Sequence, residues 1–500
     1  MTQTVQQSAD YEVVIGLEVH AQLLTKSKMF CSCSARYADD PPNTHVCPIC
    51  LGMPGVLPAI NRQAVEYTIM TALALNCSIP QNTKFDRKNY SYPDLMKGYQ
   101  ISQYDAPIGR DGWLDVETDG TTRRIGIIRV HLEEDVAKLS HHSTPWGESY
   151  SLVDVNRSGV PLMEVVGAPD IRSPEEARLY LMKLRSILTC LGVSTGNMEE
   201  GSFRCDANIS IRPAGSSEYL PKVEVKNMNS FKAVYQALDY EAQRQKKLVV
   251  SGGVPVQETR GWVDDDGVTV SLRSKEYAHD YRYFPEPDLP PLAISREWVE
   301  EIRSRIPELP DARRNRFMQQ YGLSLDDANL LTSSNEMTDL FEKTVAEKRI
   351  SGLDLRVRAK EVANWLSGDF SRLLNLSRVD VKAAQLKVTP KNLASLIWLR
   401  NESAINTPTA KTILEDMFNT GKDPEELVAE KGLSQITDAS SIEQAVDKAI
   451  ADNPAAVADF RAGKEQAITF LVGQTMKLTR GRANPQAVRK ALLDKLGEKR

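Results

Sequence analysis

The chain of 500 residues has no apolar run that approaches the roughly 20 residues needed to span a bilayer. Its first ten residues are polar and carry neither the basic nor the apolar pattern of a targeting signal. Long low-complexity segments and repeats of the solenoid kind are also absent. These absences argue against a membrane protein, a secreted protein and a repeat protein. They predict a cytoplasmic globular protein, and the chain length suggests about three domains.

Several common motifs are missing as well. The sequence contains neither the G-x-x-x-x-G-K-[ST] phosphate loop nor the G-x-G-x-x-G dinucleotide fingerprint. It contains no Gly/Ser-rich amidase segment and no cysteine in the context of a nucleophile elbow. We therefore expect neither of the two familiar nucleotide-binding motifs nor an amidase activity in this chain.

Four segments alternate between apolar residues and charged or imidazole residues, which predicts strands because side chains change face at every residue of a strand. They are residues 15–22, 128–133, 203–209 and 222–226. Their polar sides carry Glu18, His20, Gln22, Arg129, His131, Glu133, Arg204, Asp206, Asn208, Lys222, Glu224 and Lys226. For any one strand, a solvated face is the simpler explanation. Together, closely spaced carboxylates and imidazoles beside arginine are groups that hold a divalent cation and a phosphate.

The composition and the residue pattern of the sequence change twice along the chain. Residues 1–295 are rich in Gly, Pro, aromatic residues and short alternating runs, which predicts an α+β domain dominated by antiparallel strands. Residues 296–405 carry repeated helix-start signals and predict an all-α domain. Residues 406–500 follow a connector and predict a small α-helical tail domain, with Pro424 and Pro454 at helix starts.

Four of the seven cysteines form a C-x-C pair and a C-x-x-C pair separated by a short proline-containing loop. They are Cys31, Cys33, Cys47 and Cys50. Two such pairs can surround a tetrahedral ion, so the spacing predicts a zinc site inserted near residues 31–50. Four thiolates leave no open coordination position, so this zinc would be structural. Unliganded thiols, or His45 in place of one sulfur, are the alternatives.

The segment from Lys84 to Asp105 is the densest in chemical groups. Its cationic side chains could contact phosphates, and its tyrosines offer flat surfaces on which a base can stack. These residues are Lys84, Arg87, Lys88 and Lys97, and Tyr90, Tyr92, Tyr99 and Tyr104. The alternative is a solvated loop.

Several motifs together resemble the B subunits of aspartyl/glutamyl-tRNA(Asn/Gln) amidotransferases. They are GLEVH at 16–20, FDRKNY at 85–90, YQISQ at 99–103, HLEED at 131–135 and DYRYFPEPD at 280–288. The run FLVGQ at 470–474, with ANP at 483–485, resembles the tRNA-binding end of that family. The resemblance spans most of the chain.

The resemblance implies a ligase of protein biosynthesis that forms a carbon–nitrogen bond with glutamine as amido donor. In this family, ATP phosphorylates the side-chain carboxylate of misacylated Glu-tRNA(Gln) or Asp-tRNA(Asn), and ammonia then displaces the phosphate. The ammonia would come from an amidase A subunit, in a heterotrimer that also contains a small C subunit. The family's cradle domain resembles the sheet of glutamine synthetase and guanidino kinases, which binds nucleotide together with metal ions.

The resemblance also assigns roles to residues of the polar strands. His20, Glu134 and Glu164 are expected to bind one Mg²⁺, and Glu18 and Asp206 are expected to hold a second, nucleotide-associated ion. Arg87, Lys88, Tyr90 and Lys226 are the candidates for contacts with ATP and its phosphates. Strand alternation instead places Glu133, and not Glu134, on the face of His131, so the assignment of Glu134 requires a bulge or a strand end.

The net charge of −5 means that contacts with nucleic acid must come from local patches. One such patch runs from Lys477 to Arg500 and contains eight Lys or Arg residues. We expect Lys477, Arg480 and Arg482 to contact tRNA. A solvated helix face at the chain end is the alternative.

Two other functions compete with the amidotransferase. One is a free-standing ligase that joins ammonia to a small carboxylic acid, against which the basic tail argues. The other is a non-catalytic, zinc-containing RNA-binding protein, which would not need carboxylates on its binding face because they repel phosphate unless a cation intervenes. The sequence leaves open whether Glu-tRNA, Asp-tRNA or both are substrates.

Overall fold

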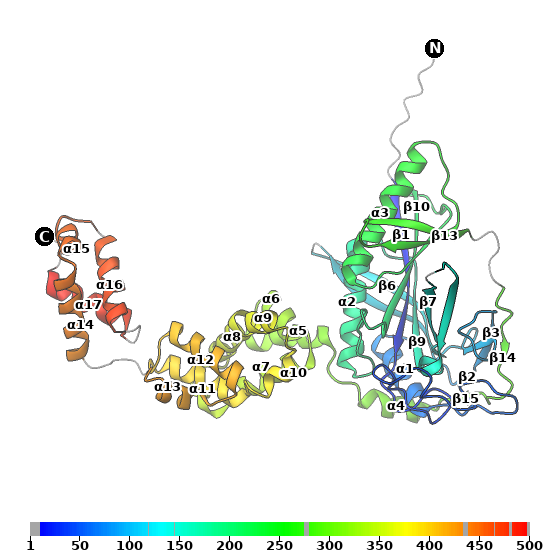
Figure 1. Cartoon of the computed structure of the whole chain (residues 1–500), viewed down its shortest axis with the longest axis horizontal. Helices are drawn as coiled ribbons and strands as arrows, with labels where there is room; N and C mark the ends of the chain where they lie inside the picture. Colours follow the sequence, from blue (N-terminus) through cyan, green and yellow to red (C-terminus); the bar gives the residue numbers. More distant parts are fainter. Residues whose placement is uncertain are drawn as a thin grey trace, which may run out of the picture. The chain divides into compact units, whose positions relative to one another are not determined.

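The structure, a computed structural model, describes residues 11–118, 120–144, 146–274, 280–433, 439–464, 466–479 and 483–497. The chain forms two compact units, Met1–Leu309 and Pro310–Arg500 (Figure 1). The first unit combines strands and helices, and the described elements of the second are all helical, so the predicted α+β class is confirmed. Among the described helices, none combines the length and the apolar character of a membrane span.

An eight-stranded sheet organises the first unit, in the order β13-β12-β11-β10-β1-β9-β6-β5. Its strands are β1 (Tyr11–Gln22), β5 (Gly109–Thr118), β6 (Thr121–Glu134), β9 (Pro161–Gly167), β10 (Phe203–Pro213), β11 (Val223–Lys226), β12 (Glu258–Val263) and β13 (Val268–Ser274). Neighbouring strands are antiparallel except β11 and β12, which are parallel. The predicted antiparallel sheet is therefore confirmed, and its four predicted strands are β1, β6, β10 and β11.

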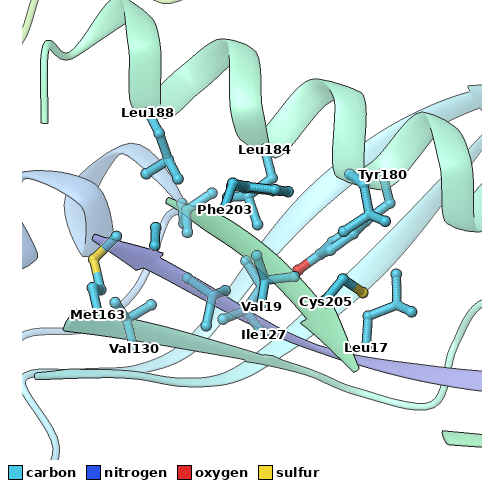
Figure 2. Packing of buried hydrophobic residues seen from close by; sticks show 14 of the residues in the cluster. Leu17, Val19, Ile127, Val130, Met163, Tyr180, Leu184, Leu188, Phe203 and Cys205 are labelled. Carbon is cyan, nitrogen blue, oxygen red and sulfur yellow. The ribbon is translucent and has the colours of Figure 1, made fainter. Parts of the chain in front are cut away.

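Helices cover the apolar face of this sheet. They are α1 (Arg62–Ala74), α2 (Pro174–Cys190) and α3 (Phe231–Val250), which contact β6, β5 and β10 respectively. Leu17 and Val19 of β1 are fully buried, and Figure 2 shows them packed with Tyr180 and Leu184 of α2. Because one set of alternating residues is buried under helices, the other set, with Glu18 and its neighbours, is left on the opposite face of the sheet.

Within the described residues, three small sheets accompany the large one. They are β14-β3-β4, built from β3 (Asp86–Asn89), β4 (Tyr99–Ser102) and β14 (Phe284–Pro285); β2 (Asn82–Thr83) with β15 (Leu292–Ala293); and β7 (Lys138–Ser143) with β8 (Ser149–Asp154). A 3₁₀ turn, η1 (Val155–Arg157), follows β8. Since β4 contacts β6, the sheet β14-β3-β4 brings the segment around Lys88 close to the polar end of β6.

The first unit ends later than the boundary predicted at residue 295. Helix α4 (Arg296–Ser304) contacts α1, and its Ile302 is fully buried in the core of the first unit. Glu66 of α1 accepts hydrogen bonds from Trp298 Nε1 at 3.4 Å and from Arg305 at 3.0 Å. These contacts extend the compact unit to Leu309.

The described residues of the second unit form two hydrophobic cores. One is formed by α5 (Pro310–Tyr321), α6 (Leu325–Leu331), α7 (Asn335–Val345), α8 (Leu355–Trp365), α9 (Ser371–Ser377), α10 (Val381–Gln385), α11 (Pro390–Asn401), α12 (Thr407–Thr420) and α13 (Pro424–Glu430), with the turns η2 (Lys348–Ile350) and η3 (Leu366–Phe370). The other is formed by α14 (Ala439–Asp452), α15 (Pro454–Arg461), α16 (Gln466–Leu478) and α17 (Pro485–Leu496).

The boundary predicted between residues 405 and 406 does not separate these cores. Ile413, Leu414 and Met417 of α12 are fully buried in the first of them, together with Leu393 of α11. The connector before α12 therefore joins two helices of one core, and the second core begins with α14.

Candidate functional site

Imidazoles and carboxylates from three adjacent strands form a row on the polar face. Glu164 of β9 pairs with His20 of β1 on one side and with His131 of β6 on the other. His20 Nε2 lies 3.4 Å from Glu164 Oε2 and 3.7 Å from Glu133 Oε1. His131 Nε2 lies 3.2 Å from Glu164 Oε2 and 3.6 Å from Glu133 Oε2. We call His20, His131, Glu133 and Glu164 the acidic row.

The acidic row has the geometry of a cation site. Ligand atoms of His20, Glu133 and Glu164 lie within 4.8 Å of one another. Neighbouring ligands of an octahedral Mg²⁺ are about 3 Å apart, because the metal–oxygen distance is about 2.1 Å. His20 Nε2 lies 3.4 and 3.7 Å from carboxylate oxygens of Glu164 and Glu133, within about 1 Å of that value. One imidazole and two carboxylates therefore fit a divalent cation.

Mutual electrostatics already stabilise the charged forms in this row. Burial alone would raise the pKa of Glu164, but His131 and His20 hold it well below its ordinary value. Burial alone would lower the pKa of His131, but Glu164 and Glu133 raise it to about 9. Two buried carboxylates thus require positive charge beside them, which either imidazolium protons or a metal ion can supply.

The structure places Glu133, and not Glu134, in the acidic row. The ladder between β6 and β9 runs without a bulge from Arg129 to Glu134, so alternation persists to the strand end. Glu134 instead accepts a hydrogen bond from the Ile101 N–H at 3.0 Å and pairs with the Lys97 ammonium. The structure therefore places Glu133, as strand alternation predicts, beside His20 and Glu164, and metal binding by Glu134 stays a prediction.

A second pair of carboxylates lies beside the row. Glu18 of β1 and Asp206 of β10 are directly opposite each other in the ladder. Burial, Glu164 and Asp206 raise the pKa of Glu18. Asn208 donates to Glu18 at 3.0 Å, and Lys226 Nζ donates to Asp206 at 2.6 Å. The structure thus brings Glu18, Asp206 and Lys226 together next to His20 and Glu164.

Lys88 faces the acidic row from β3. Its ammonium lies 4.9 Å from the ring centroid of Tyr281 and 5.9 Å from that of Tyr90. Burial opposes the charge of Lys88, but Glu133 and Glu164 raise its pKa. Tyr281 and Tyr283 were missed as site residues, although both belong to the DYRYFPEPD motif, because only the pairing of β14 with β3 brings them beside Lys88.

Arg87 points away from this group, as the neighbour of Lys88 in a strand must. Its guanidinium forms two hydrogen bonds of 2.7 Å with Glu286 and one of 3.1 Å with Asp288. In this structure its donors are engaged by carboxylates on the other side of β3, and a phosphate contact of Arg87 stays a prediction.

Comparison with known proteins adds the family. A family model described as the GatB/GatE catalytic domain matches residues 13–300. The chain belongs to the GatB/GatE family. A second model, described as the GatB domain, matches residues 339–496. The matched GatB/GatE catalytic domain contains the large sheet, the acidic row and Lys88.

Curated relatives match over nearly the whole chain. A protein of Dehalococcoides mccartyi, named as the B subunit of an aspartyl/glutamyl-tRNA(Asn/Gln) amidotransferase, is 59% identical over 488 residues, which are 98% of this chain and 99% of that protein. Proteins of the same name from Carboxydothermus hydrogenoformans and Brevibacillus brevis are 55% and 54% identical. They cover 98% and 97% of this chain, and each match includes 99% of the relative.

The four clustered cysteines of this GatB/GatE chain converge. Their sulfur atoms lie within 4.8 Å of one another, and those of Cys47 and Cys50 are 3.8 Å apart. Sulfurs on a tetrahedral zinc are separated by about 3.8 Å, because each Zn–S bond is about 2.3 Å. The Cys31 thiol, with a smaller contribution from Lys28, lowers the pKa of Cys50 to about 4. His45 Nε2 lies instead 2.7 Å from Asp40, outside this cluster.

A buried ion-pair network next to the acidic row also escaped the sequence analysis. Asp135 is 2% exposed and accepts hydrogen bonds from Arg204 at 2.9 Å and from Gln22 at 2.7 Å. Arg157 lies 3.7 Å from the same carboxylate. Arg204 pairs with His20 in the ladder, so this network fixes the end of the GatB/GatE sheet that carries the row. In the sequence, Asp135 appears only as the last residue of the HLEED motif, and nothing there indicated its arginine partners.

The predicted tRNA contacts in the matched GatB domain are only partly described. Lys477 is exposed at the end of α16. Arg480 and Arg482 lie outside the described residues, so their contribution stays a prediction.

Proposed function

We propose that this chain is the B subunit of a tRNA-dependent amidotransferase. It phosphorylates the side-chain carboxylate of glutamate or aspartate misacylated onto tRNA(Gln) or tRNA(Asn), using ATP, and then joins ammonia to the activated carbonyl. The products are Gln-tRNA(Gln) or Asn-tRNA(Asn). A glutaminase A subunit supplies the ammonia, and a small C subunit completes a cytoplasmic heterotrimer. The full-length similarity to proteins of this name supports the proposal over a free-standing ligase or an RNA-binding protein.

The observation that carries the proposal is the acidic row beside Glu18 and Asp206. A carboxylate is a poor electrophile because oxide is a poor leaving group. Transfer of the γ-phosphoryl group to a carboxylate oxygen makes an acyl phosphate, whose carbonyl ammonia attacks with loss of inorganic phosphate. Phosphoryl transfer depends mainly on positioning and on neutralising charge.

The polar face offers two cation positions for this chemistry. His20, Glu133 and Glu164 would hold one Mg²⁺, and Glu18 with Asp206 would hold a second. Bound Mg²⁺ would neutralise negative charge on the phosphates and the acceptor carboxylate. Lys88 and Lys226, the latter now paired with Asp206, would contact the phosphates of ATP. This use of an antiparallel sheet face is the arrangement expected of the glutamine synthetase and guanidino kinase type.

The remaining sites would serve structure and substrate. Cys31, Cys33, Cys47 and Cys50 would bind one structural zinc. Tyr90, Tyr281 and Tyr283 form edge contacts with centroid distances of 5.8 and 6.1 Å, and they would receive the aminoacylated end of tRNA. The tail, with Lys477, Arg480 and Arg482, would hold the tRNA body.

Reconstitution tests the proposal with a matched pair of neighbouring residues. Wild type, E133Q and E134Q are each combined with the amidase and small subunits, ATP, Mg²⁺, glutamine and misacylated Glu-tRNA. E133Q should lower Gln-tRNA formation by at least about 100-fold, because it removes a charge that balances the metal. E134Q should retain it, and glutaminase activity should persist in both.

Two results would contradict parts of this proposal separately. If the wild-type assembly formed no amidated tRNA, the function would be wrong. If E133Q worked normally while E134Q was inactive, the function would stand and the acidic row would be the wrong metal site.

A further inference from the structure

Lys28 is a buried cation in the loop that follows β1. Its side chain is 0% exposed, and it is among the largest fully buried side chains of the described chain. Transfer of an ammonium group from water to a protein interior costs several kcal/mol unless hydrogen bonds and opposite charge compensate. Such a group therefore calls for an identified counter-charge.

The hydrogen bonds of Lys28 go to neutral groups. Its Nζ donates to the carbonyl of His45 at 2.8 Å and to that of Val155 at 3.4 Å. Within the described part of the chain, no carboxylate forms an ion pair with Lys28. Two carbonyl dipoles satisfy donors of the ammonium, but they leave its net charge uncompensated.

The cysteine cluster is the anionic group next to Lys28. The Lys28 N–H donates to the carbonyl of Cys33 at 2.9 Å. A β-carbon placed on Gly159 would lie 3.6 Å from Cδ of Lys28 and 3.8 Å from Cβ of Cys50. The aliphatic part of the Lys28 side chain and Cys50 thus lie on either side of the same glycine. The ammonium group of Lys28 lies between the carbonyl of His45, two residues before Cys47, and the carbonyl of Val155 in η1.

The charge of a zinc-loaded cysteine cluster is opposite to that of Lys28. Zinc with four thiolates has a net charge of −2, from +2 and four times −1. We propose that Lys28 is the internal counter-cation of the zinc tetrathiolate, so that it increases zinc affinity by its charge. The inference rests on the proposed zinc site. Groups behind the ligands commonly tune a metal site in this way.

The competing explanation is that Lys28 only links backbone segments. In that case its hydrogen bonds to His45 and Val155 would stabilise the fold equally with and without zinc. As a counter-cation, Lys28 stabilises the zinc-loaded form, in which all four cysteines are thiolates, more than the zinc-free form, in which fewer of them are ionised. The two forms of the protein therefore distinguish the explanations.

The experiment compares the full-length wild type with K28M and K26M. Methionine keeps most of the length of the stem and removes the charge, and Lys26 is an exposed lysine of the same loop, so K26M is the matched control. Zinc affinity is measured by competition with a chelator of known affinity, and thermal unfolding is recorded for zinc-loaded and zinc-free protein. K28M should bind zinc about 10- to 100-fold more weakly than wild type, with K26M unchanged. The melting temperature of K28M should fall more in the zinc-loaded form than in the zinc-free form.

The possible outcomes separate the inference from the zinc site itself. A wild type that binds no zinc would remove the zinc site. A wild type that binds zinc while K28M binds it equally well would overturn the inference, as would an equal fall in melting temperature with and without zinc.

A measurement on the wild type covers the case in which K28M does not fold. Lys28 should resist amine acylation in the zinc-loaded protein and become reactive when a chelator removes zinc, because the buried ammonium has then lost its counter-charge. Lys26 should react equally in both. Full protection of Lys28 after zinc removal would overturn the proposal.

Discussion

Consecutive residues of β6 show how strongly one position changes the environment of a carboxylate. Glu133 lies 3.6 Å from His131 on the polar face, whereas Glu134 bonds to Ile101 and Lys97 on the other side. The next residue, Asp135, leaves the strand and joins two arginines. Three adjacent acids therefore lie in three different environments: the acidic row, a link between strands and a buried ion-pair network.

The Asp135 network predicts a pH-dependent loss of stability. Burial alone would raise the pKa of Asp135, but Arg204 and Arg157 hold it below its ordinary value. A lowered folded-state pKa means that the carboxylate stabilises the fold above the unfolded-state value of about 3.9 and that this contribution is lost as the pH falls through the folded-state pKa. D135N should lower the free energy of unfolding by about 1.5–3 kcal/mol near pH 7, because it removes the charge to which two half-buried arginines are paired.

Urea unfolding at pH 7 and at pH values below about 4 measures this effect. The difference in free energy of unfolding between wild type and D135N should become smaller at acid pH. D265N, whose substitution lies in an exposed turn, should have the same free energy of unfolding as wild type at every pH. A difference that stayed constant across this pH range would show that the charge of Asp135 is not the cause.

At the scale of elements, the packing of α4 on α1 determines where the first unit ends. Ile302 is fully buried, and Arg305, just after α4, bonds to Glu66. The sequence pattern of α4 is helical, which groups it with the helices that follow it. Its contacts assign it to the sheet domain instead.

Two truncations test this assignment. A chain that ends at residue 309 should unfold cooperatively, and one that ends at residue 295 should melt at least about 5 °C lower because it loses the buried Ile302 and exposes Glu66. Circular dichroism during heating gives both melting temperatures. Equal values would place α4 outside the stable unit.

At the scale of the whole molecule, the division of the helical unit into two cores decides where the tail can be removed. Deletion of residues 434–500 leaves the core around α12 complete, whereas deletion of residues 406–500 removes Ile413, Leu414 and Met417 from it. The shorter deletion is therefore the appropriate one for testing the tail.

We expect the deletion of residues 434–500 to weaken the binding of misacylated tRNA and to flatten its dependence on salt. The deleted segment contains the basic patch from Lys477 to Arg500, and each lost phosphate contact reduces the salt slope by roughly 1. Nucleotide binding by the sheet should persist. Affinities measured across a salt series provide the test, and an unchanged affinity and slope would place tRNA recognition elsewhere.

The sequence alone determined the features that depend on neighbours in the chain. Alternation around His20 predicted β1 and its polar face, because the period of a strand is a local property. Pro424 and Pro454 predicted helix starts that the structure contains, because a proline at the first helical position acts within one turn. The spacing of Cys31, Cys33, Cys47 and Cys50 predicted a cluster that the structure shows.

Only the tertiary structure decided what depends on register and packing between distant segments. The ladder between β6 and β9 selected Glu133 over Glu134, and the pairing of β14 with β3 placed Tyr281 beside Lys88. The burial of Met417 assigned α12 to its core. Strand order and long-range contacts arise from the packing of the whole chain, and a local pattern carries no information on which distant partner each face will meet.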